Sequence, residues 1–260
     1  MLLKSCQSLL NKISLTRVSC QQARLFSQSI HFRSEANNQN EGDEAQLTFC
    51  TENRQGVFCA GADLKERATL TLDQVSHFVT SLRKLLTDIE QLPMPVIAAI
   101  DGVALGGGLE MALACDIRIA AHNARMGLVE TKLAIIPGAG GTQRLPRIIS
   151  PPLAKELIFT SRIFNGQEAE KMGICNYSVL QNETGTAAYE KALTLADEIL
   201  PNGPIGVRCA KKAIDKGLQV DISTGYAIEE ACYAQVIPTK DRLEGLKAFA
   251  EKRKPEYKGE

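Results

Sequence analysis

The 260-residue chain carries 30 lysines and arginines against 30 aspartates and glutamates, so its formal net charge is zero. This balance gives no general electrostatic attraction to nucleic acid or to an anionic membrane. No apolar run approaches the roughly 18 to 20 residues of a membrane span, and we expect no membrane partner. The eight cysteines form no Cys-x-x-Cys pair, which argues against a zinc centre or a disulfide framework, and we predict no metal site.

The first 33 residues have the composition of a mitochondrial presequence. No acidic residue precedes Glu35, while basic residues recur through a stretch that contains serine and leucine. We therefore expect residues 1–33 to direct the chain to the mitochondrial matrix, with processing shortly after Phe26. An ordinary basic N-terminal helix is the alternative. Residues 34–44 are rich in Asn, Gln and Glu, which predicts a flexible linker.

Residues 45–200 are predicted to form an α/β core, because β-branched runs alternate with helical patterns. The longest helical pattern covers residues 71–92 and stops before Pro93. Strands are expected at residues 46–51, 96–100, 117–120 and 126–129, and shorter helices at 153–161, 167–172 and 186–199. Residues 201–260 are predicted to be helical, over 204–216, 222–235 and 239–252.

Two glycine-bearing turns, residues 59–63 (CAGAD) and 106–110 (GGGLE), together with Glu130, point to a reaction site. Small residues let a substrate approach the main chain and permit unusual dihedral angles, as backbone donors to a developing oxyanion require. Gly107 is expected to begin a helix, where unpaired N–H groups and the helix dipole favour an anion. Taken alone, the glycines could form a plain turn, Glu110 could complement the helix dipole, and Glu130 could be a solvated loop residue.

The sequences of three segments resemble those of the enoyl-CoA hydratase (crotonase) family. These segments are Val57–Lys65, Ile97–Glu110 and Ile136–Leu145, and the resemblance runs from about Gly56 to the C-terminus. It implies the α/β, ββα superhelix of crotonases with a C-terminal helical region that packs between subunits as trimers or hexamers. It also implies an acyl-CoA substrate and no cofactor, since coenzyme A is part of the substrate. Residues 138–141 lack the spacing and the lysine of a P-loop and are read as a pocket turn.

The resemblance also assigns roles. Ala60 and Gly107 match the oxyanion-hole donors, and Glu110 and Glu130 match the two glutamates that add water across a double bond. Further substrate contacts are implied for the rest of the first turn and for two positions near the C-terminus that reach coenzyme A. These further residues are Gly61, Ala62, Asp63, Phe249 and Lys252.

The family's usual segment before the Ala60 motif, with two early strands and a helix, has no match here. We therefore expect the start of the core to be shortened and do not predict RNA binding, because the lysine-rich helix tied to it in one relative is absent. A non-catalytic subunit that joins intact trimers is the alternative to an active hydratase. The acyl group is either a dicarboxylate, which needs a cationic partner, or a plain aliphatic chain. Lys65, Arg67 and Arg144 are the candidate cations.

Overall fold

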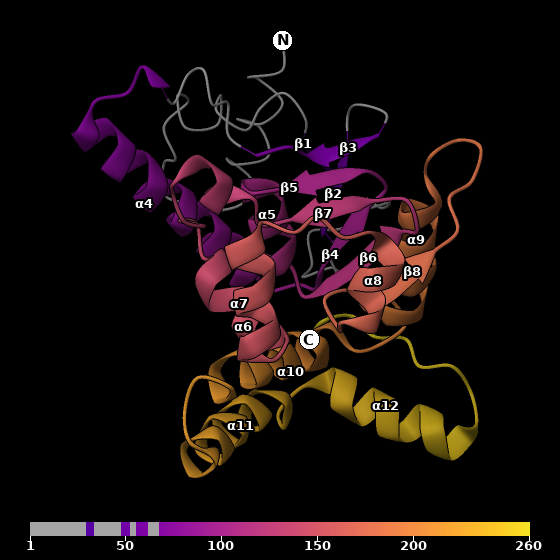
Figure 1. Cartoon of the computed structure of the whole chain (residues 1–260). Coiled ribbons are helices and arrows are strands. Elements are labelled where there is room, and N and C mark those ends of the chain that lie inside the picture. Colours follow the sequence, from indigo (N-terminus) through magenta and orange to yellow (C-terminus); the bar gives the residue numbers. More distant parts are fainter. Residues whose placement is uncertain (1–29, 34–47, 53–55, 62–67) are drawn as a thin grey trace. The chain divides into compact units, whose positions relative to one another are not determined.

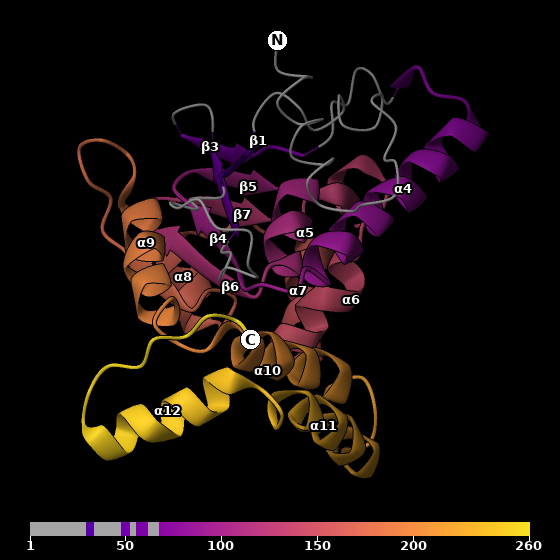
Figure 2. The same cartoon turned by 180° about the vertical axis from the view of Figure 1, so that it is seen from behind.

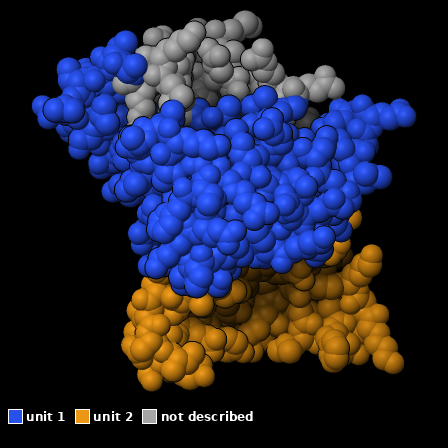
Figure 3. Space-filling model, in the orientation of Figure 1, with its two compact units in different colours: residues 1–33, 49–91, 96–192 blue, residues 34–48, 92–95, 193–260 orange. Residues whose placement is uncertain are grey.

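The computed structural model describes residues 30–33, 48–52, 56–61 and 68–260 of the chain. The described residues fall into two compact units (Figure 3). The first comprises residues 30–33, 49–52, 56–61, 68–91 and 96–192, and the second comprises residue 48, 92–95 and 193–260. The expected linker, residues 34–44, lies outside the described residues, as does the expected processing position after Phe26.

The described part of the first unit contains two sheets (Figure 1). The larger has the strand order β1-β2-β4-β6-β8, in which β1 and β2 are antiparallel while β4, β6 and β8 are parallel. Its strands are β1 (Ile30–Arg33), β2 (Thr48–Glu52), β4 (Val96–Ile100), β6 (Ile117–Ala121) and β8 (Tyr177–Val179). The smaller sheet is parallel and joins β3 (Val57–Cys59), β5 (Val103–Leu105) and β7 (Arg125–Gly127).

The centre of the larger sheet is fully buried. All five residues of β4, Val-Ile-Ala-Ala-Ile, are shielded from solvent, and four of the five residues of β6 are as well. Strands covered on both faces read as continuous apolar runs rather than as alternating ones. The predicted strands at 96–100 and 117–120 are therefore confirmed, the second with one more residue.

Strand β1 was not predicted. It lies inside the range assigned to the presequence, although after the expected processing position at Phe26, and its four residues pair with β2. The prediction of a strand at 46–51 corresponds to β2, which the structure describes from Thr48 to Glu52.

Helix α4 (Leu72–Glu90) follows the predicted apolar pattern of residues 71–92. Thr71 caps its N-terminus, since its side chain accepts a hydrogen bond from the Gln74 N–H while the Gln74 side chain accepts one from the Thr71 N–H. Leu82, Leu86 and Ile89 form its buried stripe. The helix therefore packs through its C-terminal half into the first unit.

The remaining helices of the first unit follow the strands. They are α5 (Gly107–Ala114), the 3-10 helix η1 (Glu130–Leu133), α6 (Gly141–Ile148), α7 (Pro151–Thr160) and α8 (Gly166–Lys171). Helix α5 is buried almost throughout, as the Gly-Gly-Leu-Glu-Met-Ala-Leu-Ala composition requires, because it presents no solvated face. Its N-terminus carries the second glycine motif. Buried packing thus fixes the position of Glu110 within the unit.

Three helices dominate the second unit (Figure 2). They are α10 (Pro204–Gly217), α11 (Ile222–Val236) and α12 (Lys240–Glu251), while α9 (Ala187–Ile199) passes from one unit into the other. Asp221 and Thr239 cap α11 and α12 through their side chains. Buried Asp241 accepts hydrogen bonds from the N–H groups of Lys258 and Gly259, which hold the C-terminal segment against α12. The helices predicted for residues 201–260 are confirmed.

Candidate functional site

The two glycine-bearing turns lie against each other at the start of α5. A Cβ built on Gly61 would lie 3.5 Å from the Gly107 nitrogen and 3.1 Å from the Leu105 carbonyl oxygen. Gly61 has φ of +91° and Gly106 has φ of +53°, and both values favour glycine. The structure thus brings Ala60–Gly61 beside the Gly107 N–H, as the motifs predicted.

The start of α5 has no side-chain cap. The first N–H groups of a helix have no partner within it, and together with the helix dipole they favour a bound anion. Gly107 is the first residue of α5, and Gly106 anchors the turn by donating its N–H to the Gly127 carbonyl at 2.9 Å. The arrangement therefore offers backbone donors to a negatively charged oxygen.

Gly108 is required by packing. A Cβ at this position would lie 1.9 Å from the carbonyl oxygen of Cys59 and 2.9 Å from the Cys59 Cβ, distances that no side chain can occupy. The backbone of α5 therefore runs directly over the end of β3, and this contact holds the two turns together.

Glu110 is a buried carboxylate with two backbone donors. Its side chain is 3% exposed, and Oε1 accepts hydrogen bonds from the N–H groups of Ala139 at 2.9 Å and Gly141 at 2.8 Å. Burial raises the pKa of Glu110, while these two hydrogen bonds and the charges of Arg144 and Arg83 oppose the rise. Glu110 also lies in the first turn of α5, as the alternative of a carboxylate that complements the helix dipole requires, but its burial and its two bonds to another loop go beyond that role.

Glu130 approaches the same turn from η1, shortly after β7. It is 8% exposed, and its Oε1 lies 3.4 Å from the position of a Cβ built on Gly106. Glu110, one helical turn further on, donates its backbone N–H to the Gly106 carbonyl at 3.0 Å. Both predicted glutamates thus lie at the turn that begins α5, and Glu130 is not a solvated loop residue.

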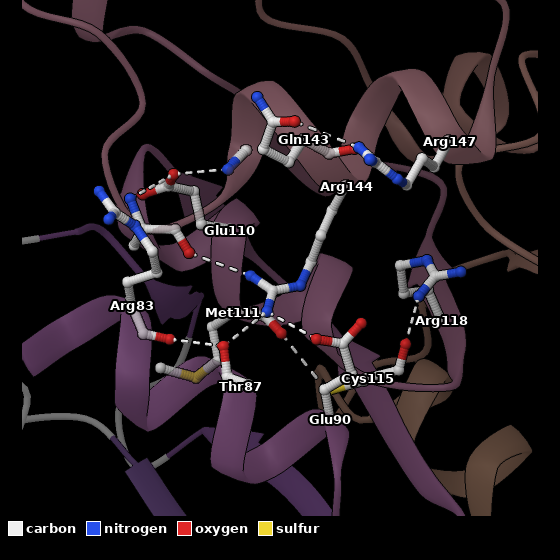
Figure 4. A network of polar contacts seen from close by, with 12 residues as sticks. Arg83, Thr87, Glu90, Glu110, Met111, Cys115, Arg118, Gln143, Arg144 and Arg147 are labelled. Atoms are coloured by element: carbon white, nitrogen blue, oxygen red, sulfur yellow. Dashed lines mark hydrogen bonds and ion pairs between the residues drawn. The ribbon is translucent and has the colours of Figure 1, made fainter. Parts of the chain in front are cut away.

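Two arginines fix the loop that carries the donors to Glu110 (Figure 4). Arg83 of α4 donates from Nε and Nη2 to the Gly138 carbonyl at 3.1 and 2.9 Å. Arg144 of α6 donates from Nη1 to the Ala139 carbonyl at 3.0 Å, and its Nη2 forms an ion pair with Glu90 at 2.7 Å. Sequence reasoning missed Arg83, which carried no motif signal.

Arg144 was a candidate partner for a distant carboxylate of the substrate. Its side chain is only 12% exposed and its guanidinium is engaged by Glu90 and by the loop, so its position indicates a role in holding the loop instead. The other two candidates, Lys65 and Arg67, lie outside the described residues, as do the predicted contacts Ala62 and Asp63.

The two predicted coenzyme contacts near the C-terminus belong to the second unit. Phe249 is 87% exposed on α12, and Lys252 is the exposed residue that ends this helix with φ of +54°. Both stay predictions as substrate contacts.

The described residues contain no group of His, Cys, Asp and Glu that could hold a metal ion. Five cysteines are buried free thiols: Cys59, Cys115, Cys175, Cys209 and Cys232. Within the ranges that the structure covers, no helix is both long and apolar enough to cross a membrane.

Comparison with known proteins gives a consistent result. Residues 34–260 match the enoyl-CoA hydratase/isomerase family, a range that includes the predicted linker at 34–44. The human mitochondrial methylglutaconyl-CoA hydratase is 65% identical over 205 residues, which cover 79% of this chain and 60% of that protein. The chain thus spans about three fifths of the length of this curated relative. Mouse mitochondrial enoyl-CoA hydratase domain-containing protein 2 is 60% identical over 79% of this chain and 69% of its own length.

Among solved structures, the enoyl-CoA hydratase of Bacillus anthracis superposes with a TM-score of 0.82 at 48% identity. The match covers 99% of this chain and 88% of that one. This likeness confirms the predicted α/β fold of the crotonase type. These matches agree with the motif sequences and with the convergence of the glycine turns. The chain belongs to the enoyl-CoA hydratase/isomerase family.

Proposed function

We propose that this chain adds water to a 2-enoyl-CoA thioester to give a 3-hydroxyacyl-CoA. The observation that carries the proposal is the meeting of Glu110 and Glu130 at the turn where Gly61 lies against the Gly107 N–H. Two buried carboxyl groups beside backbone donors supply an acid, a base and a site for a carbonyl oxygen. The relatives named as hydratases support the same reaction.

In the proposed reaction, the N–H groups of Ala60 and Gly107 hold the thioester oxygen as it gains negative charge. Glu110 takes a proton from water while the water oxygen bonds to the β-carbon. Glu130 gives its proton to the α-carbon, so that the double bond gains H and OH. Proton exchange with solvent then returns both carboxyl groups to their starting states. Removal of one oxyanion donor typically costs about 10² to 10³ in kcat.

The surroundings of Glu110 suit its proposed role as the base that takes a proton from water. Both backbone donors bind its Oε1, and in the proposed reaction Oε2 takes the proton from water. Burial raises the pKa of this carboxyl above its ordinary value, which increases its strength as a base once it is ionised. Glu130, buried at the same turn, is the group that carries the proton for the α-carbon in this proposal.

We propose 3-methylglutaconyl-CoA as the substrate, which gives 3-hydroxy-3-methylglutaryl-CoA, a step of leucine degradation. The support is the 65% identity to proteins named for this substrate. A short-chain enoyl-CoA of fatty acid oxidation is the second candidate, favoured by the engagement of Arg144 with Glu90, because a dicarboxylate needs an available cation. The mitochondrial matrix is the proposed location, in line with the relatives named mitochondrial. A trimer or hexamer is the proposed assembly.

The proposal is tested by the loss of enoyl-thioester ultraviolet absorbance with residues 27–260 and either methylglutaconyl-CoA or crotonyl-CoA. We expect turnover by the unaltered chain and a loss of about 10² to 10⁴ in kcat for Glu110→Gln and for Glu130→Gln, the range for acid–base groups. Glu156→Gln on α7, an exposed carboxylate, is the control and keeps full activity. A folded, soluble wild-type chain without turnover would exclude catalysis and favour the non-catalytic subunit.

A further inference from the structure

Arg83 contacts the catalytic region through a single peptide group. From α4, its Nε and Nη2 both donate to the carbonyl of Gly138, at 3.1 and 2.9 Å. The N–H of that same peptide group belongs to Ala139 and donates to Glu110 Oε1 at 2.9 Å. Guanidinium, peptide and carboxylate therefore form one continuous chain of hydrogen bonds.

A cation at a carbonyl oxygen draws electrons toward that oxygen and makes the N–H of the same peptide a stronger donor. Hydrogen bonds in such a chain polarise one another, and each bond is strengthened by about 10–30%. A stronger donor at a carboxylate favours its ionised form. The charge of Arg83 thus reaches Glu110 without direct contact between the two side chains.

We infer that Arg83 is a positioning residue that acts through the Gly138–Ala139 peptide to hold Glu110 ionised and correctly placed for its reaction with water. The inference rests on the proposed function, in which Glu110 is the base. It assigns a role to an exposed helix residue that no motif singles out.

Other charged and titratable groups lie on the elements around Glu110 within the described residues. Arg144 of α6 binds the next carbonyl of the loop, and Glu90 partly compensates its charge. Glu130 of η1 lies at the Gly106 turn, and the thiol of Cys59 lies at the end of β3, where burial raises its pKa. Strand β5 carries no ionisable side chain. Arg83 is bonded to the Gly138–Ala139 peptide, one of the two peptide groups whose N–H donates to Glu110.

The variants that test this inference are Arg83→Gln and Arg83→Lys. The first removes the charge, and the second keeps the charge but lacks the two guanidinium nitrogens that donate together to the Gly138 carbonyl. Lys84→Gln is the matched control, because Lys84 is exposed on the same helix and forms an ion pair with Asp88, one turn away. Both changed positions, 83 and 84, are exposed, and circular dichroism verifies that the three variants fold.

The first measurement is the pH dependence of kcat and KM for hydration. Without Arg83 the pKa of Glu110 rises, so less of it is ionised near neutral pH and the acidic limb of the kcat profile moves to higher pH. We expect kcat of Arg83→Gln to fall by roughly three- to tenfold near neutral pH, the effect of weakening one hydrogen bond to a charged group. KM changes little. The kcat of Arg83→Lys lies between those of Arg83→Gln and wild type, and the kcat of Lys84→Gln equals that of wild type.

The second measurement does not depend on turnover. The infrared band of the protonated Glu110 carboxyl, identified by its loss in Glu110→Gln, is followed as a function of pH, and in Arg83→Gln it persists to higher pH. A wild-type chain without turnover would reject the proposed function while this titration still decides the role of Arg83. If Arg83→Gln gave the same carboxyl titration as Lys84→Gln, the inference would be overturned.

Discussion

Glu110 lies between two loops that are held in different ways. They are the turn of residues 106–108, called the first turn below, and the turn of residues 138–141, called the second. The turn of residues 106–108 is fixed by backbone packing, because the Gly108 Cα lies against the Cys59 carbonyl and Gly106 donates to the Gly127 carbonyl. The turn of residues 138–141 is fixed by side chains, since its carbonyls accept from two arginines. The first turn carries the uncapped N-terminus of α5, and the second donates two N–H groups to Glu110.

This difference separates two tasks. Donors to an oxyanion are most effective when they cannot reorganise during the reaction, and close backbone packing provides that rigidity. A loop tied by arginine side chains also brings positive charge near a buried carboxyl, which opposes the cost of its burial. The first turn should therefore be intolerant of any added atom, and the second should respond in a graded way to changes in its ties.

The largest effect is expected for Gly108→Ala. The added Cβ would lie 1.9 Å from the Cys59 carbonyl oxygen, so α5 must move away from β3, at a cost of about 3 kcal/mol or more in the free energy of unfolding. Urea denaturation measures this loss. Gly206→Ala in α10 is the control, since nothing lies within 4 Å of a Cβ there, and the better helix propensity stabilises by up to about 1 kcal/mol. Equal stabilities of the two variants would contradict the packing argument.

The sequence predicted the residues of the first turn better than those of the second. The motif around Gly106 lies between strand β5 and helix α5, and its glycines are needed for local reasons that the sequence displays. The stripe of Leu82, Leu86 and Ile89 on α4 was equally readable, because helical periodicity recurs over many residues.

The second turn depends on contacts that no local pattern reveals. Arg83 lies 55 residues before Gly138 in the sequence, and an exposed arginine on an amphipathic helix has no distinguishing environment before the chain folds. Helix α6 was missed because Gly140 caps it, Gly141 is its first residue and Pro146 lies inside it, signals that usually argue against a helix. Strands β3 and β5 have three residues each, too few to show an alternation.

The next largest effect tests how strongly the arginine side chains hold the second turn. Arg144→Met keeps the length and apolar stem of the side chain but removes its bonds to the Ala139 carbonyl and to Glu90. We expect a loss of about 2 to 3 kcal/mol in the free energy of unfolding, the range for hydrogen bonds that involve a charged group. Arg147→Met is the matched control, since this exposed residue of the same helix bonds only to Gln143, and surface changes stay within about 0.5 kcal/mol. A similar small loss for both variants would show that Arg144 does not hold the loop.

The smallest effect is expected for Gly140→Ala, at the N-cap of α6. The residue has φ of +116°, and a Cβ would lie 2.3 Å from Nη1 of Arg144. Because that atom is the end of a flexible side chain, Arg144 can move aside. The expected loss in the free energy of unfolding is then about 1 to 2 kcal/mol, from backbone strain and a weaker bond between Arg144 and the Ala139 carbonyl. Gly173→Ala has φ of +77° with nothing within 4 Å of its Cβ, so it measures strain without displacement. The difference between the two variants in urea denaturation isolates the cost of moving Arg144. If combining Gly140→Ala with Arg144→Met added the two losses in full, the residues would act independently, contrary to the shared tie that the structure shows.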